Sequence, residues 1–102
     1  MIHGYILAIF DVPSTEKNDR KKYNLLVKAL RRHGFKPIQN SSFLKYQHNM
    51  KEADAFLSEF TSFKELKGSL IFIPLVESQY KKIRIIVGDI PDIAQEEAAE
   101  II

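Results

Sequence analysis

Two kinds of hydrophobic pattern alternate along this chain. Apolar runs at residues 6–10 and 70–76 predict buried strands, and a short β-branched run at 83–87 predicts a further one. Within residues 16–34 and 50–66, apolar side chains instead recur every three or four positions, which predicts two amphipathic helices. Short runs at 35–39 and 41–46 predict two more strands, separated by a bulge or tight turn near Asn40.

The order of these elements predicts an α+β fold. Strand, helix, strand, strand, helix, strand is the ferredoxin-like βαββαβ arrangement, in which two helices cover one face of an antiparallel sheet. The additional C-terminal strand at 83–87 needs a neighbour, because an unpaired apolar edge is a liability. That neighbour is either an edge of its own sheet or the sheet of a second copy. We therefore expect a ferredoxin-like domain at residues 1–88 and an acidic C-terminal tail at 89–102.

Each predicted helix has a distinct inward face. In the first helix, Pro13 ends the preceding strand, Ser14 or Thr15 is expected to cap the helix, and Gly34 is expected to end it. Its inward positions are Tyr23, Leu26, Val27, Leu30 and Gly34, and those of the second helix are Ala53, Phe56, Leu57, Phe60 and Phe63. The tail repeats a weaker apolar pattern at Ile90, Ile93, Ala94, Ala98 and Ile101.

Composition adds one asymmetry to this picture. The chain has 102 residues, enough for one domain, and a net charge of only +2. All 15 Lys and Arg lie in residues 1–88 with eight acids, a formal charge of +7, whereas the last 14 residues carry five acids and no base. A basic body favours a polyanionic partner, and an acidic end favours a different one. The absence of cysteine excludes disulfides and thiolate metal sites, and with no predicted signal or membrane segment we expect a cytoplasmic protein.

Asp11 is the first candidate functional residue. It follows the first apolar strand directly, at the point where the chain leaves the sheet. One interpretation is that its carboxylate caps the following helix; the other is that it binds a metal ion. A single carboxylate is a poor magnesium site, but a two-fold dimer would bring two Asp11 side chains to one ion.

The first helix also carries a cationic face, comprising Lys17, Lys21, Lys28, Arg31 and Arg32. Such a face is either a solvated surface or a nucleic-acid interface. Further cations at Lys36, Lys45, Lys81, Lys82 and Arg84 favour phosphate contact, and no feature indicates base reading, so we expect backbone contact without sequence preference. The three histidines, His3, His33 and His48, have no metal-ligand spacing and are expected at the surface.

Three segments in this order resemble one known family. They are FDVPSTEKNDRKKY, GFKPIQNSSFLKY and QYKKIRIIVGD, and together they span residues 6–89. The combination is similar to the CRISPR-associated protein two family, the small subunit of the spacer-acquisition machinery, in the branch found with single-protein effector nucleases. Ser42 departs from the bulky apolar residue usual at its position.

The resemblance implies a homodimer in which the closing strand crosses to the partner's sheet. Asp11 matches the family's metal-associated aspartate, which implies an Mg²⁺ ion (or Mn²⁺) shared by two Asp11 and a metal-dependent endonuclease. The main role implied is that of an adaptor, which holds the double-stranded DNA prespacer and bridges two dimers of the CRISPR-associated integrase (protein one), docking on it through the acidic tail or the closing strand. Arg20 is expected to reach phosphate, and Gln39, Ser41 and Phe43 are expected to serve the fold or the dimer interface. The rival hypothesis is a ferredoxin-like toxin-type endoribonuclease that acts without an integrase.

Overall fold

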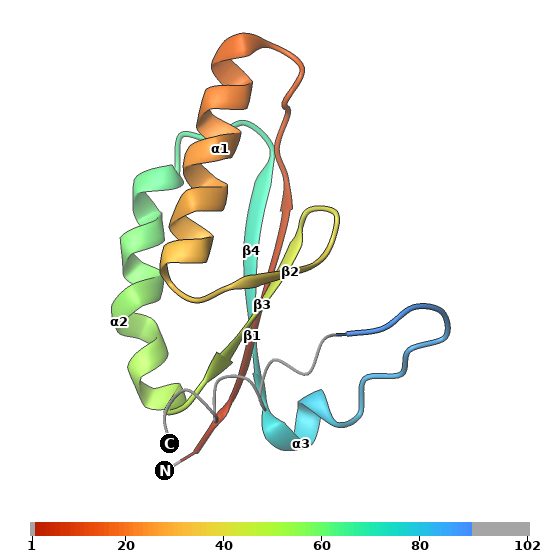
Figure 1. Cartoon of the computed structure of the whole chain (residues 1–102). Coiled ribbons are helices and arrows are strands. Elements are labelled where there is room, and N and C mark those ends of the chain that lie inside the picture. The colour runs from red at the N-terminus through yellow and green to blue at the C-terminus, as the bar shows by residue number, and fades with distance from the viewer. Residues whose placement is uncertain (1, 91–102) are drawn as a thin grey trace.

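The computed structural model describes residues 2–90 of the chain, in two layers (Figure 1). Four strands form the sheet: β1 (Gly4–Asp11), β2 (Lys36–Gln39), β3 (Ser42–Gln47) and β4 (Ser69–Val76). The helical elements are α1 (Lys17–Arg32), the 3₁₀ helix η1 (Met50–Glu52), α2 (Ala53–Leu57), the 3₁₀ helix η2 (Ser58–Phe63) and α3 (Glu77–Tyr80). The predicted tail lies outside the described residues except for Asp89 and Ile90.

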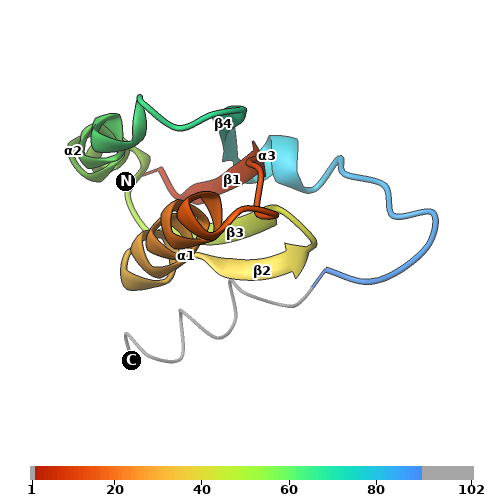
Figure 2. The same cartoon turned by 90° about the horizontal axis from the view of Figure 1, so that it is seen from above.

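The sheet has the strand order β2-β3-β1-β4, and every neighbouring pair is antiparallel. Because α1 connects β1 to β2, and β3 lies between them, the first three strands form the split βαβ unit. Figure 2 shows α1 and α2 on the same face of the sheet. These observations confirm the predicted α+β ferredoxin-like fold.

The core lies between the sheet and these helices. Ile6, Ala8 and Phe10 alternate along β1 and are buried against Leu26 and Leu30 of α1, each of which has 0% exposure. Four phenylalanine rings from later parts of the chain complete the cluster: Phe35, Phe43, Phe60 and Phe72. The inward residues predicted for both helices belong to this cluster or pack against it, except Gly34, which lies in the turn after α1.

The opposite face of the sheet is only partly covered, which corrects the prediction of fully buried strands. Leu7 pairs with Ile73 and Ile9 with Ile71, and these side chains share the face away from the helices. Ile9, Ile71 and Ile73 are exposed, Ile71 by 52%. Toward the start of β1, Tyr80 and Ile90 pack on this face against Tyr5 and Leu44. The continuous apolar runs therefore mark strands with one buried face and one apolar, exposed face, hereafter the open face.

The second predicted helix, 50–66, is not one α-helix. Only Ala53–Leu57 is α-helical, and 3₁₀ turns precede and follow it. Within η2, the hydroxyls of Ser58, Thr61 and Ser62 each donate to the carbonyl three residues earlier, at 2.8, 2.7 and 3.1 Å. Such bonds compete with the α-helical pattern and account for the 3₁₀ geometry of η2, although the predicted amphipathic period was right.

The C-terminal part of the domain contains a second correction. Residues 83–87 form no strand, and Ile86 and Val87 are 89% and 88% exposed. The segment after α3 projects away from the sheet in Figure 1, so no edge of its own sheet pairs with it. The short helix α3 was not predicted; its start is fixed by the Val76 N–H, which donates to Gln79 Oε1 at 2.9 Å.

The turn predicted near Asn40 is confirmed. Ser41 has a φ of 64°, and the β2–β3 register shifts between Pro37 and Gln39. The Phe10 N–H donates to the Ser41 carbonyl at 3.0 Å, which ties this turn to β1 one residue before Asp11.

Candidate functional site

Asp11 is the last residue of β1 and is exposed. Its register partner is Ser69 of β4, and by strand alternation its side chain lies on the open face with Leu7 and Ile9. The N-cap of α1 is Glu16, without a side-chain cap bond. The interpretation of Asp11 as a helix cap is therefore wrong, and so is the cap predicted at Ser14 or Thr15.

The backbone holds Asp11 closely on one side. Gly68, just before β4, has a φ of +95°, and a side chain at this position would overlap the Asp11 carbonyl. Only a residue without Cβ allows the chain to enter β4 so close to the end of β1. The exposed carboxylate thus projects from a rigid strand end rather than from a loose loop.

The single carboxylate of Asp11 offers too few ligands to hold a metal ion by itself. Among residues 2–90, no group of three or more His, Asp or Glu side chains is placed to hold a metal ion together. A carboxylate oxygen is a suitable Mg²⁺ ligand, but the ion needs further oxygen ligands, from a second protomer, a substrate phosphate or water. Metal chemistry at Asp11 therefore requires ligands beyond those that residues 2–90 bring together.

The predicted cations of α1 are exposed and cover the helix surface that faces away from the sheet. They are Lys17, Arg20, Lys21, Lys28, Arg31 and Arg32, hereafter the α1 basic surface. The acid within α1, Asp19, is buried in the first turn and does not interrupt this surface. Arg20 is partly committed to the fold, since its guanidinium donates to the Thr15 carbonyl at 2.5 Å.

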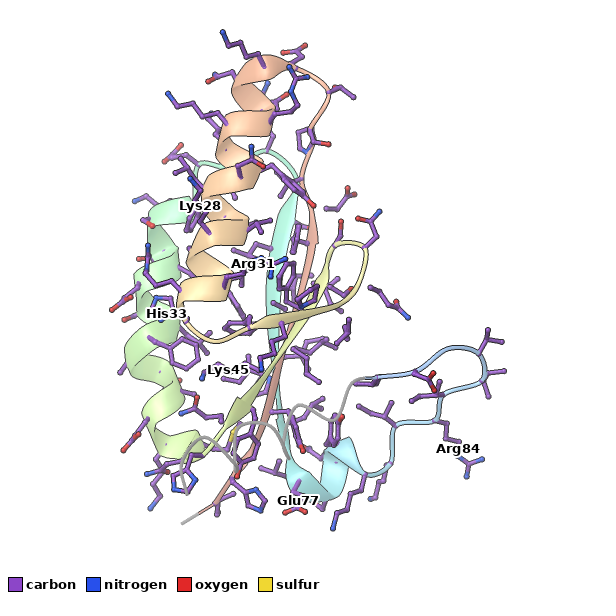
Figure 3. The ribbon with its side chains drawn as sticks, in the orientation of Figure 1. Lys28, Arg31, His33, Lys45, Glu77 and Arg84 are labelled. Carbon is purple, nitrogen blue, oxygen red and sulfur yellow. The ribbon has the colours of Figure 1, made fainter. Side chains whose placement is uncertain are left out.

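Lys28 and Arg31 lie on opposite margins of the α1 basic surface (Figure 3). Lys28 borders a groove between α1 and η2. Arg31 borders a groove between α1 and the β2–β3 turn, and its guanidinium carbon lies 5.7 Å from the centre of the Phe43 ring. The surface is therefore continuous but flanked by a groove on each side, which the sequence did not predict.

The second groove also brings together the motif residues Gln39, Ser41 and Phe43. Phe43 is buried on the helix side of the sheet, and the Ser41 carbonyl is bonded to β1, so both serve the fold of the protomer. Gln39 is exposed at the end of β2. An interface role for these residues stays a prediction.

A side-chain network at the opposite end of β1 escaped the sequence analysis. Tyr46 and His3 Nδ1 are hydrogen-bonded at 3.0 Å, and His3 Nε2 pairs with the Glu77 carboxylate of α3. Lys81 lies 3.1 Å from the same carboxylate. The hydrogen bond from Lys81, together with the charge of His3, lowers the pKa of Glu77. His33 likewise pairs with Glu59 at 2.9 Å. The partners of His3 and His33 come from separate elements, so no sequence spacing could indicate those pairs. Glu77 and Lys81 instead have the i, i+4 spacing of one helix.

We expect Glu77→Gln to loosen α3 only above acidic pH. The lowered pKa of Glu77 means that its ion pairs stabilise the folded chain above the ordinary glutamate pKa of about 4.3, and that this contribution is lost as the pH falls through the lowered value. Hydrogen exchange of residues 77–83 should therefore be faster in the variant than in the wild type at pH 7. The two proteins should converge only as the pH falls through the lowered pKa of Glu77.

Glu65→Gln is the control for this experiment, since Glu65 is exposed and makes no ion pair among the described residues. It should leave exchange at residues 77–83 unchanged. An equal difference between Glu77→Gln and wild type at every pH would contradict the prediction.

The comparisons with known proteins agree with the fold. Residues 4–83 match the family described as CRISPR associated protein Cas2. The CRISPR-associated endoribonuclease Cas2 of Ligilactobacillus salivarius (strain UCC118) is 31% identical over 83 residues, which cover 81% of this chain and 82% of that protein. The proteins of the same name from Treponema denticola and Parvibaculum lavamentivorans are 27% and 24% identical over 84 residues, which cover 82% of this chain and 83% of each relative.

No helix within residues 2–90 has the length and apolar character needed to cross a membrane.

Proposed function

Because the chain belongs to the CRISPR-associated Cas2 family, we propose that it acts in CRISPR spacer acquisition as a dimeric adaptor that binds double-stranded DNA. The observation that carries this proposal is the α1 basic surface. It presents six exposed cations and no exposed acid over a helix of 16 residues, which is about 24 Å long. A duplex has a phosphate pair every 3.4 Å along its axis, so a surface of this length can follow several consecutive phosphates.

This surface would recognise DNA through the charge of its phosphate backbone. Lys and Arg contacts to phosphate fix the position of a duplex but carry no sequence information. An adaptor that holds the middle of an incoming DNA fragment needs this type of contact, because the fragment's sequence varies from one event to the next. The chemistry of α1 thus suits the proposed role.

The open face supports the dimer. It carries exposed Ile9, Ile71 and Ile73, and the projecting segment 83–87 adds further exposed apolar residues. Apolar surface of this kind is typical of protein interfaces. We propose that two copies associate through the open face and that the segment 83–87 of each becomes a strand on the partner's sheet.

Asp11 lies on the open face of each chain, so a dimer formed through this face would bring the two Asp11 side chains together. Two such carboxylates would hold an Mg²⁺ ion (or Mn²⁺), which when bound polarises a phosphodiester and activates water. The names of the relatives favour endoribonuclease activity as a second function of this chain. The family match over residues 4–83 favours a CRISPR protein over the rival toxin-type endoribonuclease.

The adaptor proposal is tested with the purified chain, the CRISPR-associated integrase and a duplex of prespacer length. We expect a complex in which one dimer of this protein joins two integrase dimers. Multi-angle light scattering measures the mass of this complex, in a reducing buffer that matches the expected cytoplasmic location. Ile71→Arg should yield a monomer and abolish the bridge, because it places a charge on the open face. Ala55→Arg is the control: Ala55 is exposed in α2, on the helix layer, and its substitution should leave both the dimer and the bridge intact.

A dimer that persists in Ile71→Arg would overturn the open face as the interface. Failure of the wild-type protein to bind the integrase would overturn the adaptor role.

A further inference from the structure

The groove between α1 and η2 exposes apolar side chains that no part of the described chain covers. Leu25, in the middle of α1, is 52% exposed. It lies with Ser62 and Phe63 at the junction of two adjoining hollows of about 390 and 180 Å³. Phe60 and Leu66 line the rest of the apolar floor. A groove of this kind accepts the apolar side chains of another segment.

The lip of the groove is cationic. Lys22, Lys28 and Arg32 line its α1 side, and within residues 2–90 none of them makes an ion pair. On the η2 side, Glu59 and Glu65 oppose these three cations, and Glu59 contacts His33, so cations outnumber acids along the lip. Figure 3 places Lys28 and His33 on the side of α1 that faces α2 and η2. The groove therefore fits a segment with an apolar stripe and acidic flanks.

The last twelve residues of this chain have that composition. Residues 91–102 contain four acids and no base, and their apolar side chains recur at helical spacing. We propose that this acidic tail docks in the α1–η2 groove of its own chain, with apolar side chains on the floor and carboxylates beside the cationic lip. DNA fits the lip but not the apolar floor, because phosphate gains nothing from contact with Leu25 and Phe63.

The length of the tail permits this contact in a chain whose segment 83–87 is not paired with a partner. Ile90, the last described residue, then packs against Tyr5 and Leu44 on the other side of the sheet. Twelve fully extended residues span about 40 Å, which matches the longest dimension of the molecule, 40 Å. An extended tail can therefore pass around the sheet edge and place only its last residues, including Ile101, in the groove.

Docking would have a consequence for the proposed function. Lys28 and Arg32 belong both to the groove lip and to the α1 basic surface, so a docked tail and a bound duplex exclude each other at these residues. This consequence rests on the proposed DNA binding, whereas docking itself does not. A docked tail is also withheld from the integrase.

The chain contains no tryptophan, so Ile101→Trp introduces a single fluorescent reporter into the tail. Without DNA present, we expect its emission to be blue-shifted and protected from acrylamide relative to a free peptide of residues 89–102 carrying the same substitution. Adding Leu25→Asp, or separately the pair Lys28→Glu and Arg32→Glu, should abolish both effects. Lys51→Glu, an exposed charge reversal in η1, should preserve them.

Circular dichroism verifies that each variant is folded. If Leu25→Asp does not fold, the pair Lys28→Glu and Arg32→Glu still tests the groove. Emission equal to that of the free peptide would overturn the proposal. A blue shift that survives both groove variants would also overturn it, because the tail would then lie elsewhere. Mixing the Ile101→Trp, Leu25→Asp chain with excess wild type distinguishes a contact between copies, since restored protection would show docking on the partner and overturn docking within one chain.

Discussion

Replacing Lys17, Lys21, Lys28, Arg31 and Arg32 together with alanine is expected to weaken duplex binding by about 100-fold or more at 0.1 M salt. Each cation that contacts phosphate releases a counterion, so the slope of log K against log salt should fall by up to about 0.9 for each lost contact. Fluorescence anisotropy with a labelled duplex, measured over a range of salt concentrations, gives both quantities. All five residues are exposed, so the substitutions should leave the fold intact.

A control removes charge from parts of the surface that are not proposed to bind DNA or a partner. Lys51, Lys64 and Lys67 are exposed and lie outside α1. Replacing these three with alanine should lower the affinity much less for each charge removed and leave most of the salt slope. Equal losses for each charge removed in the two variants would mean that net charge, rather than the α1 basic surface, governs binding.

Asp11→Asn is expected to reduce Mg²⁺-dependent phosphodiester cleavage on the order of 100-fold, because the change removes the charge that would hold the ion in each half site. Duplex affinity should not change, since Asp11 lies on the open face and the α1 basic surface lies on the helix layer. The measurement is single-turnover cleavage of labelled RNA and DNA, with and without Mg²⁺.

Asp54→Asn serves as the control, since Asp54 is an exposed acid of α2, on the helix side of the sheet. Cleavage that persists at the wild-type rate in scrupulously purified Asp11→Asn would show that Asp11 is not the site. The same variant in a spacer-integration assay separates the two proposed functions. Integration by a variant that no longer cleaves would show that the adaptor role is independent of the nuclease.

The predicted elements succeeded where the signal was local. Apolar spacing located β1, α1 and β4 within a few residues, and Gly34 ends α1 with a φ of +89° as its position indicated. The prediction failed where neighbouring groups decide the outcome. Hydroxyl bonds to backbone carbonyls accompany the 3₁₀ turns of η2 in the second predicted helix. Residues 83–87 have the composition of a strand, but within residues 2–90 they have no strand to pair with.

The same division applies to the candidate site. Asp11 and the cations of α1 could be identified from the sequence, because a strand end and a helical period are both visible in it. The helix-cap interpretation of Asp11 could not be rejected until the N-cap of α1 was located at Glu16. The network of His3, Tyr46 and Glu77 was invisible, since these residues meet only through pairing of β1 with β3 and β4.

By itself, the sequence determined the order of the elements, the inward face of each helix and the separation of a basic body from an acidic tail, because periodicity and charge are properties of neighbouring residues. Tertiary structure decided which face of the sheet is covered. It placed Asp11 on the open face, opposite the helices, and it set two grooves along the margins of the α1 basic surface. These features depend on strand register and on packing between distant segments, which no local pattern encodes.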